Sequence, residues 1–332
     1  MKQPSPLKFM EAINGIQKAA VARAAVELDV FTLVARGHDT VESLATATGC
    51  APKGIRVLMD ALTVLEMVEK QSGAYRLTPD STVYLNRDST EFMADSILFT
   101  HSDFVQRAFQ SFTEAVRIGG AAVDGEGTIG AGHPVWIQYA RGMMALARPQ
   151  ARTVVNLAPA AHRILDIATG HGLFGILLLQ AHPLATCVAV DWENVLPNAL
   201  ENARAAGVDG RFQAIAGSAF EVEFGTGYDT VLLPNFLHHF QPAACLRLLR
   251  RVAESMVPGG RLFAIAPIPN EDRVSPSAPA WFATMMLATT PSGDAYTESE
   301  YAGLLREAGF GQPELHPVTG SARSVLVSVK PG

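Results

Sequence analysis

Two stretches in the second half of the chain hold residues whose types and spacing could do chemistry. The first is a glycine-rich turn, Asp166-Ile-Ala-Thr-Gly-His-Gly-Leu-Phe-Gly175, directly after the apolar run RILDI. Glycine permits turns that other residues resist and lets a ligand approach the backbone closely. The turn opens a helical pattern, whose first N–H groups have no partner within the helix. We therefore expect a cofactor to lie against this turn.

An acidic residue at the end of the next apolar run indicates what kind of cofactor this is. The run TCVAVD ends in Asp191, which is followed by Trp192. A carboxylate at this place can accept hydrogen bonds from both hydroxyls of a ribose. By its letters, Gly170-x-Gly172-x-x-Gly175 with an acid about 20 residues further on is also the dinucleotide fingerprint, a weak signal when taken alone. The pattern thus fits both NAD and S-adenosylmethionine.

Three features favour S-adenosylmethionine. Asp166 stands at the strand end, where it would repel a pyrophosphate but tolerates the ammonium group of a methionine. The turn Gly217-Ser218-Ala219-Phe220 is polar and then aromatic, which suits an adenine. A terminal hairpin, described below, is not expected in a six-stranded parallel dinucleotide fold.

The second stretch with chemical potential is a histidine pair, His238 and His239, after the run DTVLLPNFL. A neutral imidazole with a pKa near 6.5 is the side chain best suited to take a proton at neutral pH. Adjacent residues at a strand–helix junction point in different directions, so we expect at most one to face a cleft. Either one could instead be a capping or hydrogen-bonded structural histidine.

Alternating short apolar runs and helical patterns from residue 163 predict a parallel sheet with helices on both faces. After a helix over 298–308, the runs QPELHPV and RSVLVSV lie only a short loop apart. They should pair antiparallel, because a parallel pair needs a long crossover. The terminal hairpin then places one reversed strand inside or beside five parallel strands. The expected parallel strands are RILDI, TCVAVD, RFQAIA, DTVLL and RLFAI, with helices over 173–181, 194–206 and 242–256.

The first part of the chain has a helical pattern. Apolar residues recur at helical spacing over 7–36, and Asp39 with Glu42 predicts the start of a short helix that ends at Gly49. Pro52 suits the first turn of the next helix, and residues 67–77 read as a small hairpin. This is the plan of a winged helix. Further helices are expected over 91–157, broken by a glycine-rich stretch at 119–132, and Trp136, Tyr139, Met143 and Met144 are interpreted there mainly as core.

Composition describes an ordinary folded protein with 48% hydrophobic and 17% charged residues over 332 residues. The net charge of −6 argues against nucleic acid as the main partner, so the winged helix is expected to supply dimer surface and part of a pocket wall. Cys50, Cys187 and Cys245 lie far apart, which predicts neither disulfides nor a cysteine zinc site. Without a signal-like or membrane-spanning apolar run, a cytoplasmic protein is expected.

On these motifs, residues 163–330 resemble a class I S-adenosylmethionine-dependent methyltransferase, and the run VPGGRL before the fifth strand is typical of that class. From about residue 7 onward the chain resembles the O-methyltransferases of plant phenolic and bacterial polyketide metabolism, together with hydroxyindole O-methyltransferase. The implied fold class is α/β, a Rossmann-like methyltransferase sheet with a terminal antiparallel hairpin plus an all-α, winged-helix N-terminal domain. The implied domains are 1–95 for dimerisation, 96–160 as a helical linker that contributes to the substrate pocket, and 161–332 for catalysis.

The resemblance also implies a function. S-adenosylmethionine, which becomes S-adenosylhomocysteine, would donate a methyl group to a hydroxyl of a small, apolar or aromatic substrate, with His238 as general base. No metal is needed, because the sulfonium is already an activated electrophile. A homodimer is expected, with no membrane partner. The implied cofactor contacts are Asp166, Gly170, Gly172, Asp191, Trp192, Ser218, Ala219, Phe220, Asn235 and Met143, and the implied substrate pocket contains Trp281, Met285 and Met286.

The chain departs from the family pattern at several positions. Ala168 replaces the first glycine of the turn, and Ser218 stands where an acid often contacts the adenine. The two glutamates that flank the base in the plant enzymes fall on Ala266 and Ala295. The acids that could substitute for them are Asp294, Glu271 and Asp272.

Two other functions stay open at this point. A cofactor-sensing transcriptional regulator would keep the winged helix and the nucleoside site without catalysis, and the missing carboxylates favour it while the net charge opposes it. The other is an NAD-dependent oxidoreductase. The sequence does not identify the acceptor molecule, nor does it separate methylation of oxygen from that of nitrogen or carbon.

Overall fold

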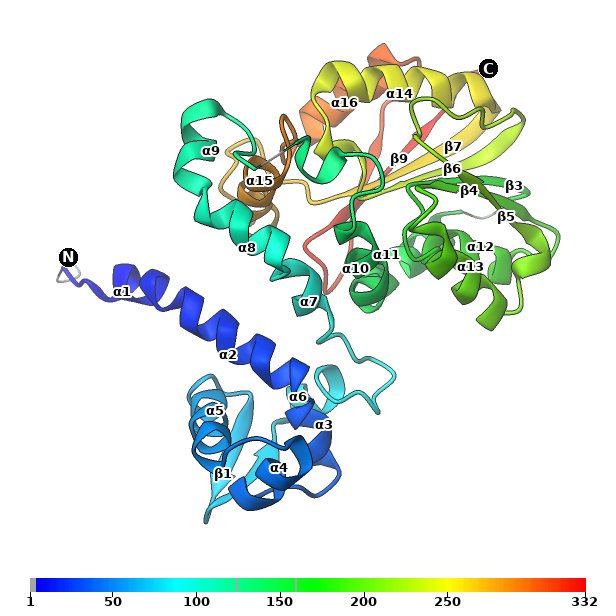
Figure 1. Cartoon of the computed structure of the whole chain (residues 1–332). Coiled ribbons are helices and arrows are strands. Elements are labelled where there is room, and N and C mark those ends of the chain that lie inside the picture. Colours follow the sequence, from blue (N-terminus) through cyan, green and yellow to red (C-terminus); the bar gives the residue numbers. More distant parts are fainter. Residues whose placement is uncertain (1–3, 124, 159) are drawn as a thin grey trace. The chain divides into compact units, whose positions relative to one another are not determined.

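The computed structural model describes residues 4–123, 125–158 and 160–332. Within it the chain forms two compact units, one up to Ser102 and one from Asp103 onward, shown in Figure 1. The second unit contains the sheet together with the helices that precede it in the chain. The finer division at residues 95 and 160 stays a prediction.

The first unit is helical with one small hairpin, in the order expected of a winged helix. The helical spacing over 7–36 is divided among three helices, separated at Asn14 and at Leu28–Asp29, where Asp29 adopts a left-handed φ of 53°. The helices are α1 (Leu7–Ile13), α2 (Gly15–Glu27), α3 (Val30–Ala35), α4 (Val41–Thr48), α5 (Pro52–Val64), α6 (Pro79–Tyr84) and α7 (Ser96–Thr100), and the hairpin pairs β1 (Val68–Gln71) with β2 (Ala74–Leu77).

The N-cap of α4 is Thr40, one residue later than the predicted cap Asp39. Thr40 and Ser43 form the capping box, and each side chain accepts a hydrogen bond from the other's backbone N–H. The pair predicted for this role, Asp39 and Glu42, has the same spacing and matches the sequence rule, whereas Ser43 takes the place of the Glu or Gln that the rule expects. The helix ends as predicted at Gly49, which has a φ of 68°.

The second unit contains a seven-stranded sheet in the order β5-β4-β3-β6-β7-β9-β8. The first five of these are parallel, β9 runs antiparallel to β7, and β8 pairs antiparallel with β9. The predicted reversed strand therefore lies inside the sheet, and the predicted fold class is confirmed. The strands are β3 (Arg163–Ile167), β4 (Thr186–Asp191), β5 (Phe212–Ala216), β6 (Tyr228–Pro234), β7 (Met256–Ala266), β8 (Glu314–Pro317) and β9 (Ser324–Val329).

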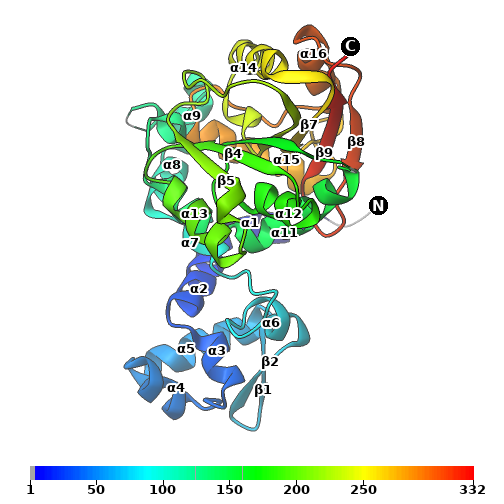
Figure 2. The same cartoon turned by 90° about the vertical axis from the view of Figure 1, so that its right-hand side faces the viewer.

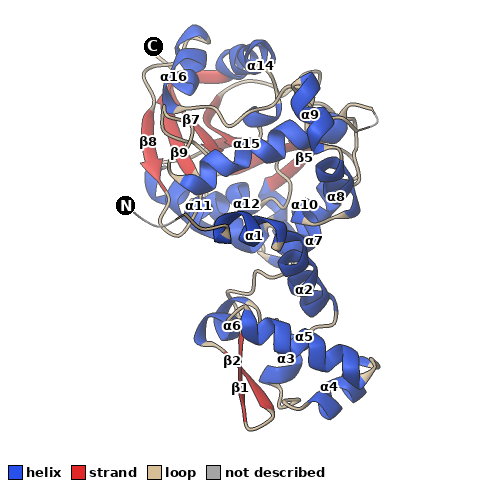
Figure 3. Ribbon diagram, turned by 90° about the vertical axis from the view of Figure 1, so that its left-hand side faces the viewer, coloured by secondary structure: helices blue, strands red, loops and turns tan. Residues whose placement is uncertain are grey.

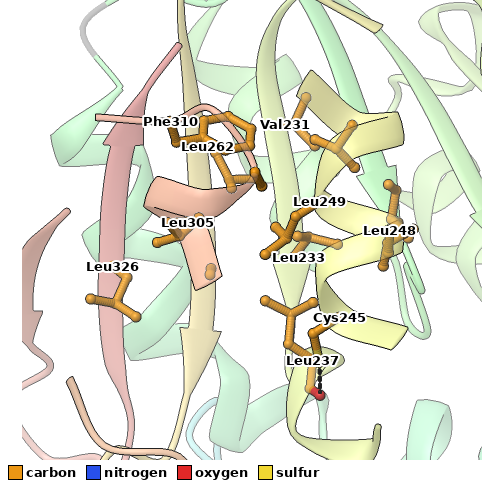
Figure 4. Close-up of a cluster of buried hydrophobic side chains, with 14 of the residues drawn as sticks. Val231, Leu233, Leu237, Cys245, Leu248, Leu249, Leu262, Leu305, Phe310 and Leu326 are labelled. Atoms are coloured by element: carbon orange, nitrogen blue, oxygen red, sulfur yellow. Dashed lines mark hydrogen bonds between the residues drawn. The ribbon is translucent and has the colours of Figure 1, made fainter. Parts of the chain in front are cut away.

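Helices cover both faces of this sheet (Figures 1 and 2). On one face, α14 (Pro242–Ser255) and α16 (Glu298–Glu307) bury a cluster that includes Val231, Leu249 and Leu305, shown in Figure 4. On the other face pack α11 (Met144–Leu157), α12 (Leu173–Ala181) and α13 (Leu196–Ala205).

The rest of the second unit is helical, as Figure 3 shows by colour. Helix α15 (Ser277–Thr289) packs against α8 (Asp103–Gln110) and α9 (Phe112–Ile118). A glycine-rich segment with the short helix η1 (Gly127–Ile129) then leads to α10 (Val135–Gly142). Among the described residues, no helix has both the length and the apolar character needed to cross a membrane.

Candidate functional site

A cavity of about 330 Å³ opens in the second unit at the carboxyl ends of β3, β4, β5 and β6. Ligands of open parallel sheets bind at this edge, and the volume is that of a small-molecule site. Seven of the ten predicted cofactor contacts line it: Gly170, Asp191, Trp192, Ser218, Ala219, Phe220 and Asn235.

Asp191 ties the first turn to the end of the second parallel strand. Its Oδ2 accepts a hydrogen bond from the N–H of Gly170 at 2.8 Å, and its Oδ1 accepts one from the N–H of Trp192 at 2.7 Å. Burial raises the pKa of Asp191 to about 6 despite these bonds. Each oxygen retains acceptor capacity, so the carboxylate can bind two hydroxyls of a ligand in the cavity.

Asp166 lies behind the turn and does not line the cavity. Its Oδ2 accepts hydrogen bonds from the Thr169 hydroxyl at 2.8 Å and the Gly175 N–H at 3.2 Å. Its Oδ1 is buried and has no hydrogen-bond partner among the described residues. Burial raises the pKa of this carboxyl to about 7. Asp166 therefore holds the turn in shape from below.

The other two predicted contacts also lie off the cavity wall. Gly172 has a left-handed φ of 77°, and an added Cβ would come within 3.1 Å of the Ala199 Cβ, so it allows α12 and α13 to pack closely. Met143 is buried between α10 and α11. Ala168, which the sequence placed at a glycine position, does line the cavity and has a φ of 56°.

The far wall of the cavity comes from the glycine-rich segment and α10, which sequence reasoning largely missed. Trp136 donates from Nε1 to the Thr128 carbonyl at 2.8 Å, and the Thr128 hydroxyl donates to the Thr289 carbonyl at 3.2 Å. Gly127 packs on the same end of α15, where a Cβ would collide with the Thr289 carbonyl. The helical spacing of Trp136 and Tyr139 was the available signal, but it indicates core as readily as a cavity wall. The wall includes Glu126, Thr128, Ile129, Ala131, Trp136 and Tyr139.

The two histidines face different surroundings. His239 lines the cavity, with its ring centroid 5.1 Å from that of Trp136. His238 does not line it; its ring lies edge-on to Phe282 of α15 at 4.8 Å. Burial lowers the pKa of both imidazoles, that of His239 to about 4, and neither Nδ1 atom has a hydrogen-bond partner among the described residues.

Within the described part of the chain, none of the three candidate carboxylates forms a hydrogen bond with the His238 ring, although the backbone N–H of Asp294 donates to the His238 carbonyl at 2.9 Å. Asp294 pairs with Arg273 at 3.3 Å, Glu271 accepts a hydrogen bond from Ser299, and Asp272 accepts one from Ser275. Ala266 and Ala295 are both buried. Within the described ranges, no group of three or more His, Cys, Asp or Glu side chains could hold a metal ion.

The residues expected in the substrate pocket lie on α15 and do not line the cavity. Trp281 is 76% exposed, whereas Met286 is buried and Met285 is partly exposed. Phe282, between them, is the residue of this helix that reaches the histidine pair.

Comparison with known proteins identifies the family. A family model described as the O-methyltransferase domain matches residues 135–311, and one described as the O-methyltransferase dimerisation domain matches residues 10–87. The 3-hydroxy-5-methyl-1-naphthoate 3-O-methyltransferase of Streptomyces sahachiroi is 26% identical over 98% of this chain and 95% of its own length. The chain belongs to the O-methyltransferase family.

Solved structures agree with this assignment. A Nostoc punctiforme protein, assigned as an O-methyltransferase, is 42% identical, with a TM-score of 0.95 over 99% of this chain and all of that one. Human N-acetylserotonin methyltransferase, solved with S-adenosylmethionine, is 22% identical, with a TM-score of 0.87 over 100% of this chain and 99% of its own. The likeness to the human enzyme shows that the two proteins have the same fold.

Replacing Ala168 by glycine should stabilise the second unit. A left-handed φ costs an alanine about 1 kcal/mol relative to glycine, so we expect the free energy of unfolding to rise by about that amount. Tryptophan fluorescence during urea unfolding measures this unit alone, since all three tryptophans lie in it.

Ala219→Gly is the matched control, because Ala219 also lines the cavity but has no positive φ. We expect this variant to be no more stable than the parent chain. An equal gain from both substitutions would contradict the assignment of strain to Ala168.

Asp166→Asn should change how stability depends on pH. The folded-state pKa of about 7 lies above the unfolded value near 4, so the folded chain retains a proton that the unfolded chain releases between these pH values. Stability of the parent chain therefore falls across this window, by up to about 1.4 kcal/mol per pH unit. The variant cannot ionise and should lose this contribution. Urea unfolding at pH 4.5, 5.5, 6.5 and 7.5 measures both slopes, and parallel slopes would contradict the shift.

Proposed function

We propose that this protein transfers the methyl group of S-adenosylmethionine to a hydroxyl of a small aromatic molecule. The observation that carries the proposal is that all the required groups line one cavity. It combines an anchored carboxylate, Asp191, and the aromatic rings of Trp192 and Phe220 with Asn235 and a histidine. The family assignment supports methyl transfer to oxygen.

The residues on the wall fit this cofactor. S-adenosylmethionine supplies a methyl group that its sulfonium has already activated. Asp191 has acceptor capacity for the two ribose hydroxyls, and Trp192 and Phe220 offer aromatic surface for the adenine. The backbone of the Ala168–Gly170 turn would lie against the methionine portion. A pyrophosphate would meet a wall with the acidic side chains of Glu126, Asp191 and Glu221, which supports S-adenosylmethionine over NAD.

His238 is proposed to remove the proton from the acceptor hydroxyl. Burial lowers the pKa of its imidazole, which keeps the ring neutral and able to accept a proton. The position matches the catalytic histidine of the resembling enzymes. His239 is the alternative base, favoured by its place on the cavity wall.

The acceptor is proposed to be flat and largely apolar. The wall around the histidine contains Trp136, Tyr139, Phe236 and Phe240, and large aromatic side chains favour a flat ligand. The naphthoate named for the Streptomyces sahachiroi relative and the N-acetylserotonin of the human enzyme are aromatic molecules, which supports the same substrate class here.

Titration calorimetry and turnover of a His238→Ala variant test this function together. The parent chain should bind S-adenosylmethionine and S-adenosylhomocysteine, and no heat at high micromolar concentration would rule out the proposal. His238→Ala should bind the cofactor as the parent does but lose at least about 100-fold in turnover, the usual contribution of a general base.

His239→Ala is the matched neighbour variant. We expect it to keep turnover within about tenfold of the parent, because with His238 as the base the His239 ring forms part of the cavity wall and accepts no proton. Loss of turnover in His239→Ala with retention in His238→Ala would assign the base to His239 instead.

We also propose that the first unit forms a homodimer. Residues of α1 and the start of α2 present an apolar face to solvent, and the family model that covers this unit is a dimerisation domain. Light scattering at micromolar concentration should give twice the mass of the chain, and a Phe9→Ser, Ile16→Ser variant should shift toward the monomer. A monomeric parent chain would contradict the proposal. The exposed apolar residues are Leu7, Phe9, Met10, Ile13 and Ile16.

A further inference from the structure

Arg323 lies at the sheet edge that carries the cavity. It directly precedes β9, whose first residue, Ser324, pairs with Ala266 at the end of β7. Its Nε donates a hydrogen bond to Asn235 Oδ1 at 2.6 Å, and Asn235 lines the cavity. The guanidinium is therefore in contact with the cavity wall through Asn235, a residue distant from Arg323 in the sequence.

The surroundings of this guanidinium are neutral. Besides Asn235 it lies over the ring of Phe282, with its Cζ 5.5 Å from the ring centroid, and it acts electrostatically on Tyr139 and His238. Among the described residues, it makes no ion pair with a carboxylate. Burial lowers the pKa of Arg323. Arg323 is partly buried, and a cation withdrawn from water without an anion is unfavourable. Its remaining N–H donors are suited to a planar, bidentate oxyanion.

The residues near the histidine pair supply no unpaired negative charge to balance this cation. Ala266 and Ala295 supply methyl groups where the resembling enzymes have glutamates, and the nearby acid Asp294 is already paired with Arg273. The local charge beside His238 is thus positive rather than negative. Such a field stabilises an anion on the substrate better than a proton on the imidazole.

We propose that Arg323 binds a carboxylate of the acceptor, carried on the same aromatic ring system as the hydroxyl that is methylated. This inference rests on the proposed function and narrows its substrate class to hydroxylated aromatic carboxylates. Arg323 lies over Phe282 and acts electrostatically on His238, the proposed base, so we assign its remaining donors to the acceptor. The methionine carboxylate is the competing ligand, because Tyr139, on which Arg323 also acts, packs against Gly170 of the turn.

Binding of matched compounds in the presence of S-adenosylhomocysteine tests the proposal. The probes are 3-hydroxy-2-naphthoate and 3-hydroxybenzoate, each compared at pH 7 with its uncharged partner, 2-naphthol or phenol. For at least one pair, calorimetry should show the carboxylate binding at least tenfold more tightly than its partner. Equal binding within both pairs, or no binding of either carboxylate, would overturn the proposal.

Variants then assign this preference to one side chain. Arg323→Met should remove the preference for the carboxylate while leaving the affinity for S-adenosylhomocysteine within about twofold, and Arg323→Lys should keep part of the preference. Arg250→Met is the matched control, because Arg250 is an exposed arginine of the same unit paired with Glu307. It should bind all probes as the parent does.

Two outcomes with these variants would contradict the role of Arg323. Retention of the full preference in Arg323→Met would assign the carboxylate to another group. Loss of S-adenosylhomocysteine binding in a variant that still unfolds cooperatively by tryptophan fluorescence would assign Arg323 to the cofactor. Failure of the proposed function is separate, since it would appear as absent cofactor binding in the parent chain.

Discussion

The hydrogen bond from the Gly170 N–H to the Asp191 carboxylate is the contact on which the site depends. It joins the turn after β3 to the end of β4, and Asp166 supports the same turn from below through the Gly175 N–H. Because β3 to β6 are parallel, their carboxyl ends meet at one edge and bring together groups that are distant in sequence. The burial that raises the pKa values of both carboxyls follows from this arrangement.

The strands and the near wall of the cavity could be predicted because local sequence determines them. RILDI and TCVAVD are short apolar runs between helical patterns, and they match β3 and β4 to the residue. The far wall could not be predicted in the same way. Thr128 and Trp136 are held there through the carbonyl of Thr289, and no local periodicity reports a contact across 161 residues. For Trp136, helical spacing is equally consistent with core.

The histidine pair shows a second limit of sequence reasoning. Composition and position single out His238 and His239, and their adjacency implies that their rings diverge. The direction of each ring is set by the short helix η3 (Leu237–His239) and by the side chains that meet it, Phe282 on one side and Trp136 on the other. Those contacts come from α15 and α10, so the tertiary structure decides which ring lines the cavity.

The electrostatics of the site limit which hydroxyl can react. Both imidazoles have lowered pKa values because they are buried, so each is a weak base and gains little by taking a proton from an ordinary alcohol. Since no carboxylate of the described residues forms a hydrogen bond with the His238 ring, the compensation must come from the acceptor. A phenolic hydroxyl is more acidic than an alcohol, and a guanidinium beside it favours the oxyanion that attacks the methyl group. Arg323 and the missing glutamates are therefore two parts of one arrangement, in which positive charge near the acceptor replaces negative charge near the base.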